Sequence, residues 1–260
     1  MSRTEQTLRA NKQTGGSLIG YFPLGFPNLA DSVEAAVAMC ESGVDVLELG
    51  IPYSDPVMDG IVIQEATEAA LEGGFKLKDA FGAISEITSR VQAPVLVMTY
   101  WNPVMQFGEE KFASALLDSG AAGAITPDLI PDEATKWIRA TDEKGLDRVF
   151  LATPTSTGPR TQQAASSSKG FVYAVSTMGI TGARDDLDKV ARNVVAEVRA
   201  QSPSSMTAVG IGVSTAAQVK EINGYADGAI VGSAFVRAYQ QGGIEALKAK
   251  VSELAEGKKK

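Results

Sequence analysis

The sequence contains no histidine among its 260 residues and a single cysteine, Cys40. Without an imidazole, Ser-His-Asp and Cys-His nucleophilic catalysis are excluded. The zinc sites that are built from His and Cys ligands are excluded for the same reason. Proton transfer near neutral pH is therefore left to Asp, Glu, Lys or Tyr side chains with shifted pKa values.

Basic charge and long apolar runs are also scarce. The net charge of −7 argues against nucleic acid as a partner, because phosphate neutralisation needs a basic surface. No run of about 18 apolar residues indicates a transmembrane helix, and the first residues lack the apolar region of a secretory signal. One cysteine permits no internal disulfide and suits a reducing compartment, so we expect a cytoplasmic protein.

Short apolar or β-branched runs recur along the chain, and helical patterns lie between them. The runs number eight and lie at residues 17–22, 45–50, 95–100, 123–127, 148–153, 171–176, 206–212 and 228–233. Apolar residues at helical spacing occur at 29–43, 131–145 and 185–200. This alternation predicts a closed (β/α)8 TIM barrel. An open doubly wound sheet is the alternative, but it usually shows a GxGxxG loop after its first strand, and none follows here.

The barrel accounts for the whole chain as one domain, 1–260, with three additions. Residues 1–16 form an extra N-terminal segment before the first strand. Residues 51–94 hold an extended loop and two helices after the second strand, and an insertion of this length in that place is more often functional than structural. Residues from about 256 to 260, which end in three lysines, are expected to be a frayed tail.

Carboxylates near the end of the second strand are the candidate acid-base groups. If Leu47 and Leu49 pack on the helices, Glu48 points into the barrel, where lost solvation raises its pKa. A structural Glu, paired with an inward Arg or hydrogen-bonded to neighbouring strands, is the alternative, yet the inward strand positions offer no obvious basic partner. Asp55 and Asp59 follow in the loop, and either is also an ordinary turn residue. No strand carries a Schiff-base lysine and no acidic cluster suggests a metal site, so we expect no metal.

Glycine-rich loops follow the last strands. Gly210 and Gly212 end the seventh run, Gly232 and Ser233 end the eighth, and a third loop lies at 178–184. Loops after strands seven and eight bind phosphate in many barrels, with backbone N–H groups and helix N-termini as donors. Ordinary strand-to-helix turns are the alternative. These loops contain no basic residue except Arg184, so the backbone would carry the binding.

Apolar and aromatic residues point inward at the same mouth. Taken singly, such residues more often fill the core than line a ligand pocket. If the substrate is planar and apolar, the same residues would do both. The residues are Tyr21, Met98, Tyr100, Ile125 and Tyr173.

Five segments together resemble the tryptophan synthase alpha subunit family. They are LELGIPYSDPVMDG (47–60) followed by Ile63-Gln64, AGAITPDLIPDEA (122–134), FVYAVSTMGITGAR (171–184), VGIGVS (209–214) and AIVGSAFV (229–236). The resemblance runs from about residue 17 to about residue 240, in order, and its first segment is quite specific.

The resemblance implies a lyase that splits indole-3-glycerol phosphate into indole and D-glyceraldehyde 3-phosphate. It implies that Glu48 is the acid-base residue and that Asp59 accepts the indole N–H. Tyr173 would contact the substrate and help to place Glu48, and Thr181 would close a loop over Asp59. The implied phosphate-binding residues are Gly182, Gly210, Gly212, Gly232 and Ser233.

The resemblance also implies a partner. Indole would pass to a beta subunit for L-tryptophan synthesis in an alpha2beta2 heterotetramer, and pyridoxal phosphate would sit in that subunit, with no cofactor in this chain. The implied interface residues are Pro52, Asp55, Asn102 and Pro131.

Some positions differ from the family pattern, but Glu48 and Asp59 are not among them. Tyr21 stands where Phe is frequent, Ile61-Val62 where Pro-Thr is common, and Thr177-Met178 where an Arg-containing pair is frequent.

Two other functions remain open at this point. A non-catalytic subunit would bind the substrate only to activate its partner, and the intact carboxylate pair argues against it. Another phosphate-binding barrel enzyme, such as indole-glycerol-phosphate synthase or a sugar-phosphate isomerase, often needs a lysine acid that no strand supplies.

Overall fold

The strands form one parallel sheet that encircles the centre of the molecule. The computed structural model describes residues 1–156, 158–175, 184–210 and 212–259, with the side chains of 184–187 excluded. The strands are β1 (Ser17–Pro23), β2 (Val46–Gly50), β3 (Val95–Met98), β4 (Gly123–Ile125), β5 (Asp147–Val149), β6 (Leu151–Ala152), β7 (Val172–Ala174), β8 (Thr207–Val209) and β9 (Gly228–Val231). Their order, β5-β4-β3-β2-β1-β9-β8-β7-β6, places β5 and β6 at the two ends of the hydrogen-bonded ladder.

The ring closes because β5 and β6 are consecutive in the chain. β5 pairs with β4 and β6 pairs with β7, so the segment 147–152 joins the two ends of the ladder. The sequence predicted one strand here, and the structure has two because the Phe150 N–H donates to Ser168 Oγ at 3.1 Å. The predicted (β/α)8 barrel is confirmed, with its fifth strand divided at Phe150.

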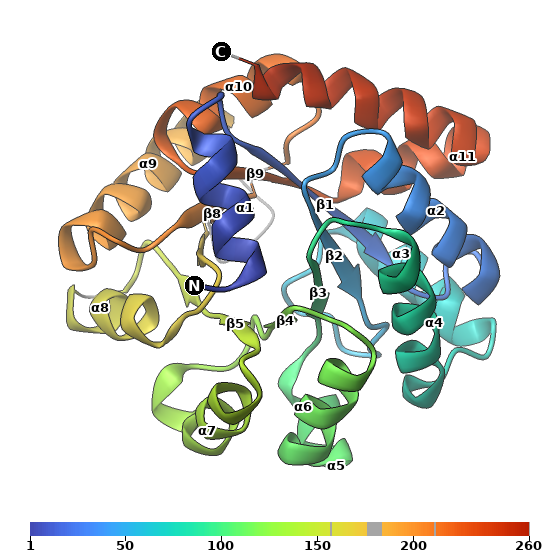
Figure 1. Cartoon of the computed structure of the whole chain (residues 1–260). Helices are drawn as coiled ribbons and strands as arrows, with labels where there is room; N and C mark the ends of the chain where they lie inside the picture. The colour runs from blue at the N-terminus through green and yellow to red at the C-terminus, as the bar shows by residue number, and fades with distance from the viewer. Residues whose placement is uncertain (157, 176–183, 211, 260) are drawn as a thin grey trace.

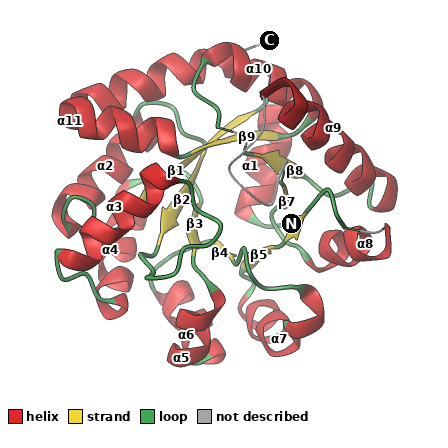
Figure 2. Cartoon of the chain, turned by 180° about the vertical axis from the view of Figure 1, so that it is seen from behind, coloured by secondary structure: helices red, strands yellow, loops and turns green. Residues whose placement is uncertain are grey.

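Helices surround the strands on all sides (Figures 1 and 2). They are α1 (Arg3–Lys12), α2 (Leu29–Glu41), α3 (Ile61–Glu72), α4 (Leu77–Arg90), α5 (Trp101–Phe107), α6 (Glu109–Asp118), η1 (Pro131–Glu133), α7 (Thr135–Lys144), α8 (Gly158–Ser167), α9 (Arg184–Gln201), α10 (Ala216–Tyr225), α11 (Ser233–Ala255) and η2 (Glu256–Lys258). Among the described residues, none of these helices has the length and apolar character that crossing a bilayer requires. The two helices expected between the second and third strands are α3 and α4.

Alternation along the strands divides the core into two layers. Inward residues, such as Ile19, Val46 and Leu96, form a cluster inside the barrel. Outward residues such as Leu47 and Leu49 pack between the strands and the helices. The predicted orientation of β2 is therefore confirmed, since Val46 and Glu48 share the inner face.

The N-terminal segment covers one mouth of the barrel. Leu8 of α1 is fully buried and belongs to the inner cluster, and α1 lies across the strands in Figure 1. An apolar side chain at this position excludes water from the inner layer. The opposite mouth, where the strands end, is left for the site.

The C-terminal residues 256–258 do not form the expected frayed tail. They make the short helix η2, in which Gly257 is buried. Lys258 Nζ donates to the Gly43 carbonyl at 2.7 Å and pairs with Asp45 at 3.0 Å. The lysine run was expected to be solvated, but Lys258 finds acceptors at the beginning of β2.

Candidate active site

A cavity of about 370 Å³ opens at the carboxyl ends of the strands. Its wall is contributed by β1, β2, β3, β7 and β9, by the loops after β2 and β8, and by the first turns of α3 and α11. The lining residues used below are Tyr21, Glu48, Met58, Asp59, Gly60, Met98, Tyr173, Gly210, Gly212, Ser214, Gly232, Ser233 and Arg237.

Glu48 lies in the wall of this cavity with 1% of its surface exposed. Its Oε1 atom has no hydrogen-bond partner among the described residues. Tyr21 stands beside it in the parallel register of β1 and β2. Burial without a counter-charge raises the pKa of Glu48 to about 8. The carboxyl group is therefore protonated in the free site at neutral pH, ready to act as an acid.

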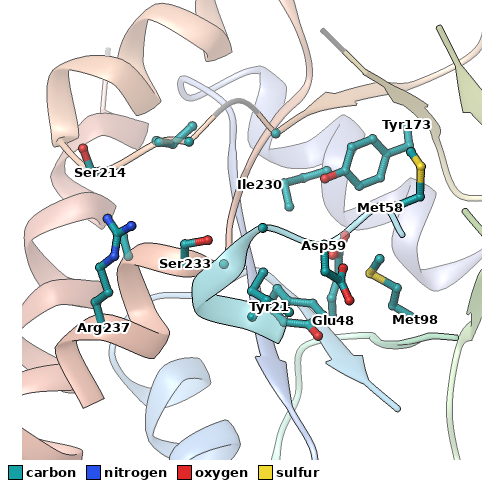
Figure 3. Close-up of a pocket in the computed structure, with 17 residues that line it drawn as sticks. Tyr21, Glu48, Met58, Asp59, Met98, Tyr173, Ser214, Ile230, Ser233 and Arg237 are labelled. Carbon is teal, nitrogen blue, oxygen red and sulfur yellow. The ribbon is translucent and has the colours of Figure 1, made fainter. Parts of the chain in front are cut away.

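Asp59 is held in the loop after β2 by its own backbone. Its N–H donates to the Pro56 carbonyl at 3.0 Å, and its carbonyl accepts from Gln64 Nε2 at 2.7 Å. The side chain is 7% exposed. Burial raises the pKa of Asp59 to about 6, against a lowering by a hydrogen bond from Tyr100. Figure 3 shows both carboxyl groups toward the same end of the cavity.

Tyr100 connects β3 to the loop that carries Asp59. Its hydroxyl accepts a hydrogen bond from the Met58 N–H at 2.9 Å and donates to the Asp59 carboxylate. Its ring stacks on Tyr53, with centroids 5.3 Å apart. Tyr100 does not line the cavity itself, so the structure places it behind Asp59 as a support for that side chain.

The other end of the cavity presents helix N-termini. Gly232 is the N-cap of α11 and Gly60 is the N-cap of α3, and neither helix has a side-chain cap. A Cβ placed on Gly60 would lie 4.0 Å from Ser233 Oγ, so the two first turns lie close together. Unsatisfied first-turn N–H groups and the positive ends of two helices favour an anion here.

Two tyrosines occupy space that only glycine leaves free. A Cβ on Gly210 would lie 2.5 Å from the hydroxyl oxygen of Tyr173. A Cβ on Gly50 would lie 2.1 Å from the hydroxyl oxygen of Tyr21. Both tyrosines therefore reach over the neighbouring strand end, and burial raises the pKa of each phenol.

Gly50→Ala is expected to displace the Tyr21 ring, because Cζ of that ring would also lie 2.5 Å from the new methyl group. Such overpacking costs about 1–3 kcal/mol of unfolding free energy. Urea denaturation measures it, with Gly82→Ala as the control: nothing lies within 4 Å of a Cβ there, and helix propensity favours Ala. Equal stability of the Gly50→Ala variant and the unmodified chain would contradict the close approach.

The cavity includes most of the predicted site residues. Ile125, the last residue of β4, is fully buried in the inner cluster and does not line the cavity, whereas its register partner Met98 does. Thr181 and Gly182, and the departure at Thr177-Met178, lie outside the described residues. The predicted roles of all these residues stay predictions. Among the described residues, no group of three or more Cys, Asp or Glu side chains is arranged to hold a metal.

The sequence profile of the tryptophan synthase alpha chain matches residues 7–260, nearly the whole chain. The chain belongs to the tryptophan synthase alpha chain family. The alpha chain of Leifsonia xyli subsp. xyli is 59% identical over 258 residues, covering 99% of this chain and 98% of that protein. The alpha chain of Mycobacterium avium is 51% identical over 93% of this chain and 88% of that protein.

Solved tryptophan synthases have the same fold. A Mycobacterium tuberculosis tryptophan synthase chain matches with a TM-score of 0.93 and 46% identity, covering 100% of this chain and 99% of that chain. A chain of the Pyrococcus furiosus a2b2 complex matches with a TM-score of 0.83 and 34% identity, covering 93% and 98%.

The residues that the tryptophan synthase resemblance assigned to a partner surface differ in exposure. Asp55 and Asn102 are exposed and Pro131 is half-buried, whereas Pro52 is buried. Pro52 follows the last backbone bonds of β2, where the Ile51 N–H donates to the Met98 carbonyl, so it stays inside the fold.

Exposed apolar side chains near these positions were not anticipated. Val57 is 77% exposed, Ile61 63% and Ile130 49%. Val57, Ile130 and Pro131 also line a second cavity of about 410 Å³. Single apolar residues in polar loops give no clear pattern in the sequence, so only the folded surface brings them together.

Sequence reasoning also missed Met58, Gln64 as a brace, Ser214 and Arg237. Arg237 lies on α11, four residues after Ser233. The helical spacing of these two residues was the available signal, because residues one turn apart share a helix face.

Proposed function

We propose that this chain is the lyase subunit of a tryptophan synthase and that it cleaves indole-3-glycerol phosphate to indole and D-glyceraldehyde 3-phosphate. The observation that carries the proposal is a single cavity with two carboxyl groups toward one end and two uncapped helix N-termini at the other. Membership of the alpha chain family supports the same reaction. The carboxyl groups would act on the indole and glycerol parts, and the helix ends would hold the phosphate.

Glu48 performs both proton transfers in this proposal. Its protonated form, favoured by burial, donates to indole C3, and the ring nitrogen takes the positive charge. The resulting carboxylate accepts the proton of the hydroxyl on the carbon bonded to C3. The electron pair of the breaking carbon–carbon bond returns to the ring, and the hydroxyl-bearing carbon becomes the aldehyde. The proton count balances, because Glu48 ends the cycle protonated.

Asp59 stabilises the cationic ring as a carboxylate that accepts the indole N–H. A fixed negative charge placed where positive charge develops acts more strongly in a buried site than in water. The Tyr100 hydroxyl and the Gln64 amide hold Asp59 in place. The indole ring itself accepts electrons, so this chain's own residues are sufficient for the proposed steps.

The proposed partner is a beta subunit that receives indole and carries pyridoxal phosphate, with no cofactor in this chain. Asp55, Asn102, Pro131 and the exposed side chains of Val57, Ile61 and Ile130 are proposed to face it. An apolar surface of this kind is typical of the centre of a protein–protein interface.

The proposed roles require a bell-shaped pH dependence of kcat/KM for indole release. Below about pH 6 activity falls as Asp59 becomes protonated, because a neutral Asp59 no longer stabilises the cation. Above about pH 8 activity falls as Glu48 loses the proton that it must donate. Initial rates with indole-3-glycerol phosphate from pH 5 to pH 10 give both limbs.

The high-pH limb distinguishes this assignment from its reverse. A Glu48 that had to be ionised in the free enzyme would give activity that rises through pH 8. A profile that is flat between pH 5 and pH 10 would contradict the involvement of both buried carboxyl groups.

A further inference from the structure

Arg237 is the one basic side chain among the described residues that line the active-site cavity. It lies in the second turn of α11, one helical turn after Ser233. In Figure 3 it stands with Ser214 and Ser233 at the end of the cavity away from Glu48 and Asp59. The cationic group and the acidic groups therefore occupy opposite ends of one space.

Among the arginines whose side chains the structure describes, Arg237 and Arg160 have no ion-pair or hydrogen-bond partner, and of these two Arg237 lines the active-site cavity. Six others form ion pairs with carboxylates, namely Arg9, Arg90, Arg139, Arg148, Arg192 and Arg199. Arg237 forms no ion pair or hydrogen bond with any described residue. Its neighbours one turn away on α11 are Ser233, Ala234, Gln240 and Gln241, none of them acidic.

Its position near the start of α11 gives no local compensation. A cation in the second turn of a helix gains nothing from the helix dipole, because that dipole favours cations only in the last turn. An anion bound at the N-terminus supplies the compensation, because both the positive end of the dipole and the arginine attract it. The unpaired guanidinium is therefore consistent with a site in which a bound anionic ligand supplies the negative charge.

Charge balance in the cavity points the same way. A phosphate monoester carries roughly −1.5 to −2 charges at neutral pH. It would share the cavity with the Asp59 carboxylate, and backbone amides supply only partial charges against it. A guanidinium adds a full positive charge and a planar pair of donors that match phosphate oxygens.

We propose that Arg237 binds the phosphate group of the substrate, together with the first-turn amides of α11 and Ser233. This inference rests on the proposed function for the identity of the substrate. With Arg237, a basic side chain contributes to phosphate binding. The glycine loops alone would bind the phosphate through backbone groups only. Because the side chain lies at the end of the cavity away from Glu48 and Asp59, it contributes to binding more than to the chemical step.

The test compares Arg237→Gln with Arg237→Lys and with Arg139→Gln, which removes the same charge from the exposed surface of α7. Each full-length chain is assayed for indole release from indole-3-glycerol phosphate and for competitive inhibition by inorganic phosphate. Arg237→Gln should raise KM and the inhibition constant of phosphate roughly tenfold, with a much smaller change in kcat. Arg237→Lys should recover most of the affinity, and Arg139→Gln should behave as the unmodified chain.

Salt provides an independent readout. An exposed charge–phosphate contact weakens as ionic strength rises, so KM of the unmodified chain should rise more steeply with salt than KM of Arg237→Gln. KM and phosphate inhibition within about twofold of the unmodified chain in Arg237→Gln would overturn the inference. So would an Arg237→Lys variant no better than Arg237→Gln.

The two readouts separate this inference from the proposed function. An unmodified chain that releases no indole, yet binds inorganic phosphate in calorimetry with a dependence on Arg237, would overturn the function and support the phosphate contact. Normal indole release, together with a phosphate affinity that does not depend on Arg237, would support the proposed function and overturn the phosphate contact.

Discussion

Glu48→Gln should lower kcat for indole release by roughly 10³- to 10⁴-fold, because one side chain makes both proton transfers and an amide makes neither. The glutamine has nearly the same shape, and Glu48 Oε1 has no partner to lose among the described residues. Binding of indole-3-propanol phosphate, a substrate analogue that cannot be cleaved, should persist. Steady-state kinetics and an analogue titration measure the two quantities separately.

Glu245→Gln is the matched control for that variant. Glu245 is a mostly exposed carboxylate on α11, paired only with Lys248 among the described residues. Its loss should leave kcat and analogue binding unchanged. Indole release by Glu48→Gln at the rate of this control would contradict the role of Glu48, and loss of analogue binding would point to a disturbed fold instead.

Asp59→Asn should lower kcat/KM for indole release by roughly 10²- to 10³-fold, the range seen when one preorganised electrostatic group is removed. The asparagine still presents an oxygen to the indole N–H, but it has no charge to stabilise the cationic ring. The acid limb of the pH profile should also disappear, since the group with a pKa of about 6 is gone. Initial rates across the pH range measure both effects.

Asp118→Asn serves as the control, because Asp118 lies at the exposed end of α6. It should retain the rate and both limbs of the profile. An Asp59→Asn variant that keeps a limb near pH 6 would show that another group titrates there, and a rate within about twofold of the control would exclude electrostatic stabilisation by Asp59.

The strand pattern was sufficient to predict the barrel because its signal is repeated. Eight apolar runs alternate with helical patterns, and Leu47 and Leu49 fix the inward direction of Glu48 through the two-residue period. The break of the fifth strand at Phe150 depends on the hydrogen bond that the Phe150 N–H donates to the hydroxyl oxygen of Ser168, 18 residues further along the chain. The binding of Lys258 to Gly43 and Asp45 likewise joins residues that are 215 and 213 positions apart in the sequence.

The candidate site likewise contains residues that could be placed from the sequence and residues that could not. Glu48 and the glycines after the last strands could be placed from strand position alone. The place of Tyr100 behind Asp59 could not be predicted in this way, because it depends on how the loop after β2 folds back over the barrel mouth. For Arg237 the four-residue spacing from Ser233 on one helix was the available signal. The burial of Pro52 and the absence of Ile125 from the cavity wall are similar, since exposure is a property of the packed structure.

The central claim is that Glu48 and Asp59 cleave the substrate in this cavity with no group beyond the chain itself. The most direct test mixes the purified full-length chain, dialysed against a chelator, with indole-3-glycerol phosphate and quantifies both products. We predict indole and glyceraldehyde 3-phosphate in equal amounts, at a rate unaffected by the chelator. No indole, or indole that appears only when a metal ion is restored, would contradict it.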